Sequence, residues 1–451
     1  MKTNKKIHLF IICLTVFFGM SAGALLGPVF PEMVGPLQTT AQNIGMLVSA
    51  ITFSTALFSL VLGPFTDRIP RKKILIFCLV LYGFTGLAAY FATDLETLLI
   101  LRFLQGIGVA GMMLVSMLLI GDLYSGPERV HATSRVGMTN AIGSVFSPLI
   151  GGLLASHSWN LPFLFYTLTL PLALFAAVCL PETNSLGPEY RGKECGNPGR
   201  ENGREQNREN GNNKKNGTPN RARNKKTFAE LLKPFLDIKI FYTIFLSFAV
   251  FFLLYALVFY LPFMLKAEFG YTSQESGLAL SLMGITVILM ASRVKVLALR
   301  YPLVCLIGAG FGFAGLSVAM IGIVHSKIII VFLLLLFGMG YGLSQIIADT
   351  LILQIAPEDS KGSIISVYNA MKYLGQTLSP IVFGFVLASS GLETVFLFAG
   401  AFGLAVAGLS WLVRGKFRAG NGHEEVGENT REHRNVHEQE YETGSLFVGE
   451  N

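Results

Sequence analysis

Twelve apolar stretches, each about 20 residues long, constrain the fold of this chain more than any other feature. A hydrocarbon core roughly 30 Å thick needs a helix of about this length to cross it. Of the 451 residues, 52% are hydrophobic and only 14% are charged, whereas a soluble domain carries roughly 25% charged residues. The sequence therefore predicts an all-α polytopic membrane protein.

The apolar stretches form two groups of six. The first stretch continues through Gly27 without a convincing small-residue cleavage site, so we interpret it as a retained helix and not as a signal peptide. The expected spans are roughly 7–30, 44–64, 74–93, 97–121, 134–155, 160–180, 240–264, 275–292, 302–324, 328–349, 363–388 and 393–413.

Basic side chains indicate the topology. A path that starts in the cytoplasm places most Lys and Arg residues in inner loops and leaves only Lys266 and Lys327 in outer loops. Basic residues gather in cytoplasmic loops, so we expect a cell-membrane protein with both termini in the cytoplasm. The same loops account for the net charge of +7, and no nucleic-acid partner is expected.

Polar composition marks the expected domain boundaries. Residues 184–236 are rich in Asn, Gly, Arg, Lys and Glu, and such a segment buries too little apolar surface to offset the entropy of ordering. We expect an N-terminal six-helix bundle at 1–183, a flexible cytoplasmic linker at 184–236, a C-terminal six-helix bundle at 237–413, and a polar cytoplasmic tail at 414–451.

A glycine–proline motif occurs once in each half. Gly143-x3-Ser147-Pro148-x3-Gly152 recurs as Gly375-x3-Ser379-Pro380-x3-Gly384. Small residues let helices pack closely, so the glycines and prolines of both copies are expected at helix contacts. Parallel repeats of this kind place a substrate site between the halves near mid-membrane, and one half then rocks against the other during transport.

Four motifs in order resemble those of the major facilitator superfamily. They are GPFTDRIPRKK (63–73) between the second and third helices, Arg102-Phe-Leu-Gln105-Gly106-Ile-Gly108, the Gly143 motif, and Pro181-Glu182-Thr183. Pro70 replaces the usual Gly of the first motif, and Ser147 replaces a Gly of the third. The resemblance implies two six-helix pseudo-repeats and favours the twelve-helix drug:proton antiporter-like branch, acting as a functional monomer.

The first motif is also a candidate gate. By this resemblance, Asp67, Arg68 and Arg71 form with Asp122 a cytoplasmic latch that holds the outward-facing state. The alternative is a solvated loop whose bases only set topology. The corresponding segment of the second half, Ser292-Arg293-Val294-Lys295, lacks the acid.

Proton coupling is implied by resemblance, with Arg102, Gln105 and Glu32 as candidates. Arg102 lies a few residues inside the fourth span, where a charge is costly and usually functional. Alternatively, its side chain extends to the outer interface. The first span has no acid between His8 and Glu32, and Asp122 and Asp349 lie near inner helix ends, so no carboxylate at mid-membrane is identified.

The eleventh span carries polar side chains on one face. Ser366, Asn369, Lys372, Tyr373, Gln376 and Ser379 recur at three- and four-residue intervals. Lipid cannot satisfy these groups, so the face contacts a cavity or another helix, and Lys372 needs water or an acidic partner. The expected substrate-cavity residues are Asn140, Tyr255, Tyr260, Asn369, Lys372, Tyr373 and Gln376.

These observations favour a secondary active transporter that exports small organic molecules or drugs in exchange for protons. The sequence has no catalytic triad, phosphate-binding loop or metal cluster, so no enzymatic activity, cofactor or metal is expected. One alternative is an importer or facilitator of a sugar or organic anion, which a cavity-facing Lys372 would favour. Another is a transporter-like sensor that binds a ligand without moving it.

Overall fold

The computed structural model describes residues 2–66, 69–182, 237–357 and 360–418. The predicted linker, most of the predicted tail, and Asp67 and Arg68 of the predicted latch lie outside these residues. Helices account for nearly all of the described chain. Their bounds are α1 Lys2–Ala24, η1 Gly27–Val29, α2 Phe30–Met33, α3 Ala41–Thr66, α4 Arg71–Phe91, α5 Leu95–Leu123, α6 Gly126–Ala155, α7 Leu161–Tyr166, α8 Thr169–Cys179, α10 Ile238–Phe269, α11 Ser273–Arg300, α12 Leu303–Ile321, α13 Lys327–Ile355, α14 Lys361–Ser390 and α15 Leu392–Arg418.

Among the described residues, eleven segments are long and apolar enough to cross a membrane. The first combines α1, η1 and α2, and the sixth combines α7 and α8. The twelfth expected span is α14, which has 30 residues but does not reach the same hydropathy. Its polar face explains this, because Asn369, Lys372 and Gln376 lower the mean hydropathy without shortening the helix.

Three helix boundaries differ clearly from the prediction: α6 begins at Gly126 and not near residue 134, α13 extends beyond residue 349 to Ile355, and α11 extends beyond residue 292. The eighth span was expected to end near residue 292, yet α11 continues to Arg300. Arg293 and Lys295 are good helix formers, and no Gly or Pro interrupts the helix before Pro302. Basic composition indicated a loop here, whereas the helix continues beyond the apolar segment and ends at Arg300, followed by the C-cap Tyr301 before Pro302.

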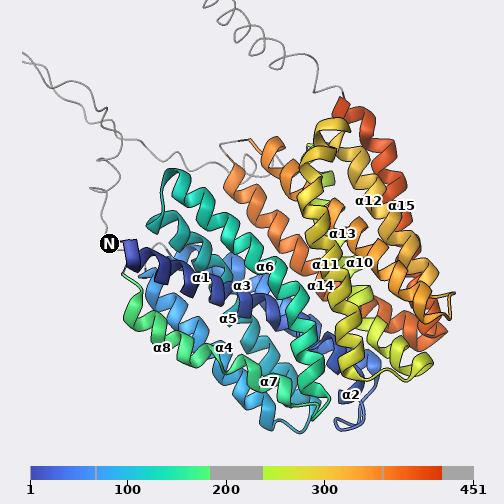
Figure 1. Cartoon of the computed structure of the whole chain (residues 1–451), viewed down its shortest axis with the longest axis horizontal. Helices are drawn as coiled ribbons and strands as arrows, with labels where there is room; N and C mark the ends of the chain where they lie inside the picture. The colour runs from blue at the N-terminus through green and yellow to red at the C-terminus, as the bar shows by residue number, and fades with distance from the viewer. Residues whose placement is uncertain (1, 67–68, 183–236, 358–359, 419–451) are drawn as a thin grey trace, which may run out of the picture.

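The two halves repeat the same helix pairing (Figure 1). In the first half, which comprises α1 to α8, α1 packs on α6, α3 on α5, and α4 on α8. In the second half, which comprises α10 to α15, the corresponding pairs are α10 with α14, α11 with α13, and α12 with α15. The sequence repeat therefore reflects a repeated three-dimensional arrangement.

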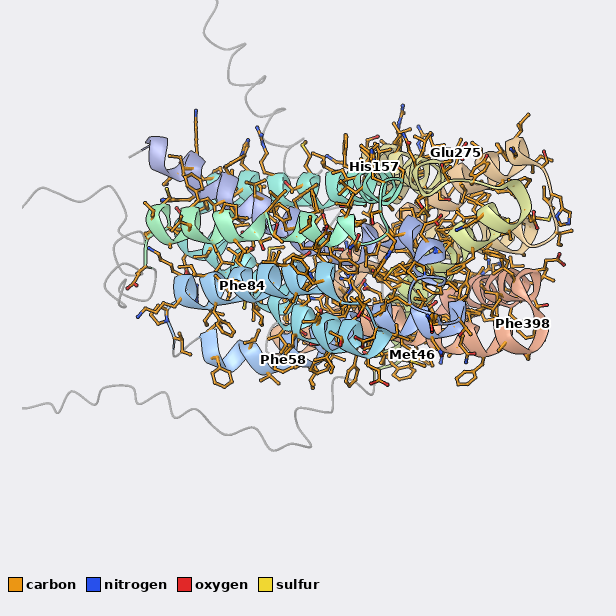
Figure 2. All side chains as sticks on the ribbon, turned by 90° about the horizontal axis from the view of Figure 1, so that it is seen from below. Met46, Phe58, Phe84, His157, Glu275 and Phe398 are labelled. Atoms are coloured by element: carbon orange, nitrogen blue, oxygen red, sulfur yellow. The ribbon has the colours of Figure 1, made fainter. Side chains whose placement is uncertain are left out.

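Large apolar side chains cover the outside of both halves. Phe84 in the first half and Phe398 in the second are 57% and 60% exposed (Figure 2). A water-facing surface rarely carries so many exposed Phe and Leu side chains together. Such a belt is suited to contact with lipid acyl chains.

The halves meet along two seams, α3 against α14 and α6 against α11. At the first seam, Ser49 donates a hydrogen bond of 2.7 Å to the Thr377 carbonyl, and the Thr52 and Thr377 hydroxyls lie 2.8 Å apart. At the second, Ser281 donates a hydrogen bond of 2.6 Å to the Val145 carbonyl.

The hydrogen bonds and the ion pair found between the halves among the described residues lie between the middle of the helices and one end of the molecule. We call it the tight end; it carries the connections 24–41, 91–95, 155–161, 269–273, 321–327 and 390–392. The opposite end carries the connections 66–71, 123–126, 300–303 and 355–361, and we call it the basic end. There, the ion pairs Lys5–Glu128 and Arg71–Asp122 both stay within the first half.

The glycine–proline motif divides its contacts between the two halves. Its first glycine faces a helix of its own half, Gly143 beside Phe17 and Gly375 beside Phe248. Its last glycine faces the opposite half, Gly152 beside Ser273 and Gly384 beside Gln42. Each copy therefore packs a helix within its half and also forms part of a seam.

Candidate functional site

Arg71 and Asp122 of the predicted latch are in contact at the basic end. Arg71 is the first residue of α4, after the N-cap Pro70, and Asp122 lies one residue before the end of α5. The two side chains form an ion pair, and Arg71 also donates to the Leu118 carbonyl at 3.3 Å. Both partners belong to the first half, so this ion pair does not connect the halves.

Arg102 is enclosed within the first half. Only 2% of the residue is exposed, so the alternative in which its side chain extends to the outer interface is wrong. Its guanidinium donates to the Ala22 carbonyl at 3.2 Å and to Gln105 Oε1 at 2.7 Å.

Two aromatic rings enclose the same guanidinium. The carbon Cζ of Arg102 lies 5.3 Å from the ring centre of Phe163 and 5.4 Å from that of Tyr166. No carboxylate of the described residues pairs with Arg102. The arginine thus holds the end of α1, close to the point where that helix stops at Ala24.

Glu32 lies at the tight end, in the first turn of α2. Its carboxylate pairs with Lys266 of the second half at 2.9 Å and accepts a hydrogen bond of 3.3 Å from Ser273. The predicted proton-coupling residue is therefore part of the contact between the halves and lies far from mid-membrane. Sequence spacing could not show its partner, which is more than 230 residues away.

The polar face of α14 points toward the first half. Thr377 contacts α3 at the seam, and Asn369 and Tyr373 lie eight and four residues earlier on the same helix face. Asn369 is exposed and Tyr373 is half-buried. They consequently extend this face from the seam toward the basic end, where the halves make no polar contact among the described residues.

Helices α6 and α10 place two more predicted cavity residues near this region. Asn140 is half-buried one turn before Ser144, and its Oδ1 atom has no hydrogen-bond partner among the described residues. Tyr255 is also half-buried, and its hydroxyl lies beside Gly23 of the first half. The Tyr255 hydroxyl therefore lies at the contact between the halves, whereas the Asn140 Oδ1 atom is itself buried.

Tyr260 and Gln376 are less available than predicted. Tyr260 is completely buried, and its hydroxyl donates to the Pro380 carbonyl at 2.9 Å. Pro380 lacks the N–H that would join the helix ladder, and this hydrogen bond ties its carbonyl to α10. Gln376 is only 7% exposed. For Tyr260 the cavity prediction is wrong, because the aromatic side chain packs between α10 and α14.

Lys372 has the acidic partner that its depth required. Its ammonium donates to Asp349 Oδ1 on α13 at 2.6 Å. The hydroxyl of Tyr368 donates to the same oxygen at 2.7 Å. Asp349 was expected at a helix end, but α13 continues six residues beyond it to Ile355. The sequence interpretation missed this pair, although both residues lie in spans where a charge is unusual.

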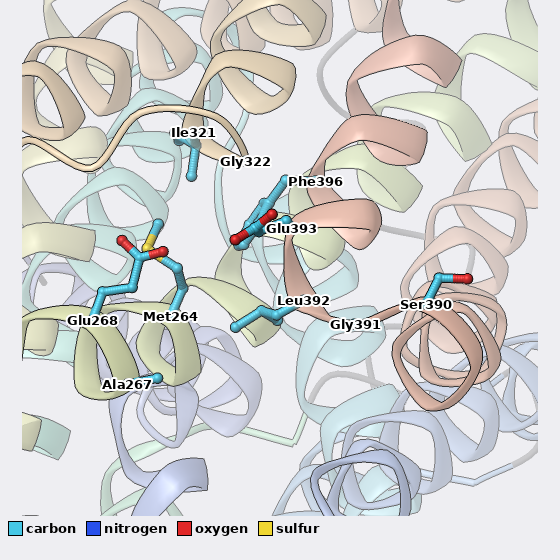
Figure 3. Close-up of a pocket in the computed structure, with 10 residues that line it drawn as sticks. All are labelled: Met264, Ala267, Glu268, Ile321, Gly322, Ser390, Gly391, Leu392, Glu393 and Phe396. Atoms are coloured by element: carbon cyan, nitrogen blue, oxygen red, sulfur yellow. The ribbon is translucent and has the colours of Figure 1, made fainter.

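A separate cavity of about 260 Å³ lies inside the second half at the tight end (Figure 3). Glu268 and Glu393 face it together with Met264 and Phe396. Glu268 also lies 3.2 Å from the Nδ1 atom of His325. No predicted cavity residue lines this space, and no residue of the first half does so.

Residues 11–380 match the profile of the Major Facilitator Superfamily, so the chain belongs to this family. The match spans most of both halves and confirms the predicted fold class. It also identifies a multi-pass membrane protein and agrees with the expectation of a transporter instead of an enzyme.

Curated relatives are similar over part of their length. One is a protein of Bacillus subtilis (strain 168) named "Bacillibactin exporter", which is 36% identical over 31% of this chain and 37% of the relative. Another, "Multidrug resistance protein 1" of the same organism, is 26% identical over 43% of this chain and 50% of the relative. The aligned region thus spans half or less of each relative.

Among solved structures, the fold is similar to that of a bacterial homolog of the human lysosomal transporter Spinster, in an inward-facing and unoccupied conformation. The TM-score is 0.73 at 15% sequence identity, over 91% of this chain and 97% of the other. At this identity the similarity concerns the fold alone.

Proposed function

We propose that this protein is a secondary active transporter that exports small organic molecules or drugs in exchange for protons. The observation that carries the proposal is the asymmetry between the two ends. The halves join through hydrogen bonds of Ser49, Thr52 and Ser281, which lie between the middle of the helices and the tight end, while the basic-end ion pairs Lys5–Glu128 and Arg71–Asp122 both stay within the first half. Alternating access requires such a one-sided contact between two repeats.

The expected topology assigns the two ends to opposite sides of the membrane. Basic loops remain in the cytoplasm, so we place the basic end and both termini on the cytoplasmic side of the cell membrane. The structure then corresponds to the state that receives a substrate from the cytoplasm. Rocking of the halves would separate the two seams and release the substrate outside. We further propose a functional monomer, since each chain supplies both halves.

The charge of the polar face bears on the substrate class. A free Lys372 would favour an organic anion, but Asp349 neutralises it in this state. The remaining candidates, Asn140, Tyr255, Asn369 and Tyr373, offer uncharged hydrogen bonds and aromatic surface. Such groups are suited to amphipathic molecules, through stacking and cation–π contact. The exporter and multidrug-resistance names of the relatives support the same class.

The first motif would control this movement. We propose that Asp67, Arg68, Arg71 and Asp122 act as a cytoplasmic latch that forms when the basic end closes. The Arg71–Asp122 pair is present although the basic end is open in this structure, so the step that we propose for closing the latch is the engagement of Asp67 and Arg68. We expect Asp67→Asn to abolish transport without reducing the amount of protein in the membrane. Wild-type transport rates in this variant would contradict the latch.

The polar segments complete the proposed organisation. Residues 184–236 would serve as a cytoplasmic tether between the six-helix bundles 1–183 and 237–413, and residues 414–451 as a polar tail. A tether of this composition leaves the halves free to rock.

The function is tested with purified protein in liposomes under an imposed pH gradient. Ethidium, tetracycline and carboxyfluorescein serve as cationic, zwitterionic and anionic probes, and protein-free liposomes measure passive leak. We expect at least one probe to move against its gradient when protons move in the opposite direction. Equal flux with and without the pH gradient would instead indicate a facilitator. Absence of pH-driven flux for every probe would refute the proposed antiport.

A further inference from the structure

The second half contains a charged cluster that none of the predicted roles explains. Asp349 of α13 accepts hydrogen bonds from the Lys372 ammonium and the Tyr368 hydroxyl, both at Oδ1. Two aromatic rings lie beside the ammonium: its nitrogen is 4.8 Å from the ring centre of Tyr368 and 5.8 Å from that of Phe251. We call Phe251, Asp349, Tyr368 and Lys372 the α13–α14 cluster.

The cluster lies deeper than the other ion pairs of the described residues. Asp349 is six residues from the basic end of α13, and Lys372 is eleven residues from the start of α14. At 1.5 Å per residue, these positions are about 9 Å and about 16 Å along their helices. By contrast, Asp122 lies one residue from the end of α5, and Glu32 lies at the tight end. A charge pair at this depth is costly and usually functional.

A purely structural ion pair would be enclosed, but this one is accessible. The Asp349 side chain is 40% exposed and that of Lys372 is 17% exposed. Asn369, one turn before Tyr373 on the face directed at the first half, is exposed as well. The hydrogen bonds of the tight end lie beyond the cluster, so protons reach Asp349 from the basic end in this conformation.

The contacts also allow the ion pair to open and close. Both hydrogen bonds to Asp349 use Oδ1, and Oδ2 has no hydrogen-bond partner among the described residues. That oxygen is therefore free to receive a proton. The rings of Tyr368 and Phe251 continue to stabilise the ammonium through cation–π contact when the carboxylate is neutral.

Other charged groups do not substitute for these partners. Helix α12 carries no charged residue, and α10 contributes the Phe251 ring. Among the described residues, only Lys372 forms an ion pair with Asp349. The remaining titratable or basic residues on these helices are Lys239, Tyr242, Tyr255, Tyr260, Lys266 and Glu268 of α10, Glu275, Arg293, Lys295 and Arg300 of α11, Cys305 of α12, Lys327 and Tyr341 of α13, and Lys361 and Tyr373 of α14.

We propose that Asp349 is the proton-carrying carboxylate of this transporter and that Lys372 is its counter-ion. The step is simple: the Asp349 carboxylate takes up one proton, the ion pair becomes a neutral acid and a ring-supported ammonium, and loss of the proton restores the pair. The net charge of the cluster changes from zero to plus one. This inference rests on the proposed proton-coupled transport and supplies the carrier that the first helix lacks.

The first test measures protonation directly and needs no substrate. Infrared difference spectra of the full-length protein between pH 5 and pH 8 report the C=O stretch of protonated carboxyl groups. We expect a band in the wild type that disappears in Asp349→Asn and persists in the matched control Glu393→Gln, a carboxylate of the separate tight-end cavity. An unchanged band in Asp349→Asn overturns the proposal. If Asp349→Asn does not fold because Lys372 is left without its partner, the double variant Asp349→Asn/Lys372→Gln removes both charges. This variant must also lack the band.

The second test separates the carrier from the proposed function. Ethidium accumulation in liposomes is measured under a one-unit pH gradient with the membrane potential clamped, beside ethidium exchange at equal pH. One-for-one proton exchange gives about tenfold accumulation, since one pH unit is a tenfold ratio of proton concentration. We expect Asp349→Asn to lose this accumulation while exchange continues, and Glu393→Gln to keep both. Full accumulation in Asp349→Asn refutes the carrier alone. A wild type with the infrared band but without accumulation refutes ethidium–proton antiport and leaves the protonation site intact.

Discussion

A substitution of Gly277 offers the sharpest test of the contact between α6 and α11. Gly277 lies on α11 opposite Pro148 of α6, and a Cβ added there would be 2.5 Å from the Pro148 carbonyl oxygen and 3.4 Å from the Cα of Gly152. Both neighbours are backbone atoms of the other half and cannot rotate away. Gly277→Ala therefore requires α6 and α11 to separate by nearly 1 Å to reach ordinary van der Waals distance.

Overpacking of this kind costs about 1–3 kcal/mol. The cost applies only while the tight end is closed, because an open seam leaves room for the methyl group. At 1.4 kcal/mol per factor of ten, the equilibrium between the states should shift about 5- to 150-fold toward opening of the tight end. The variant should therefore populate a conformation that the wild type rarely adopts.

The shift is measured by double electron–electron resonance between spin labels at Thr93→Cys and Ser389→Cys, which are exposed positions of the first and second half at the tight end. The native cysteines are replaced beforehand. We expect a longer distance to appear in Gly277→Ala. The control is Gly312→Ala on α12, where an added Cβ meets no atom within 4 Å. Identical distance distributions in wild type, Gly277→Ala and Gly312→Ala would refute this account of the seam.

Three further predictions concern charged groups. Arg102→Lys should lower the free energy of unfolding of the purified protein by about 1.5–3 kcal/mol, because lysine is shorter and has no planar guanidinium to lie beside the Phe163 and Tyr166 rings while donating to Gln105; unchanged melting would contradict this role of Arg102. Lys266→Gln should open the tight end less than Gly277→Ala does, by at most about fivefold in the spin-label assay, since its pair with Glu32 is 43% and 34% exposed. Asp122→Asn should leave the same distances unchanged, because its partner Arg71 belongs to the same half; a shifted distribution would show that the pair already links the halves.

Much of the fold could be predicted from the sequence because the bilayer restricts the possible structures. Segments of spanning length must be helical, since lipid satisfies no backbone hydrogen bond. The repeated motif at Gly143 and Gly375 then indicated corresponding helices, and the structure pairs them in the same way. The prediction of a helix end near residue 292 was wrong, because basic residues indicate where a segment leaves the hydrocarbon core and not where its helix ends.

The site was less predictable because its partners are distant in sequence. Periodicity placed Asn369, Lys372 and Tyr373 on one face, but it could not show that Asp349 approaches Lys372 from another helix. Nor could it show that Arg102 is enclosed by Phe163 and Tyr166, since the same sequence depth is compatible with an arginine at the interface. These outcomes depend on helix rotation, which packing between helices determines.

The two halves repeat the same helix packing but differ in their charged residues. Together these two facts explain how a symmetric scaffold can support proton-coupled transport in one direction. Gly152 and Gly384 make equivalent contacts across the two seams, so rocking is shared by both halves. The charges are not equivalent: the first half places Asp122 at a helix end against Arg71, whereas the second places Asp349 a full turn deeper against Lys372. A carboxylate at a helix end remains near bulk water in both states, and only the deeper one changes its access when the halves rock. Under the two proposals above, gating would belong to the first half and proton exchange to the second, and exchanging the depths of the two acids should disable transport even though the net charge is unchanged.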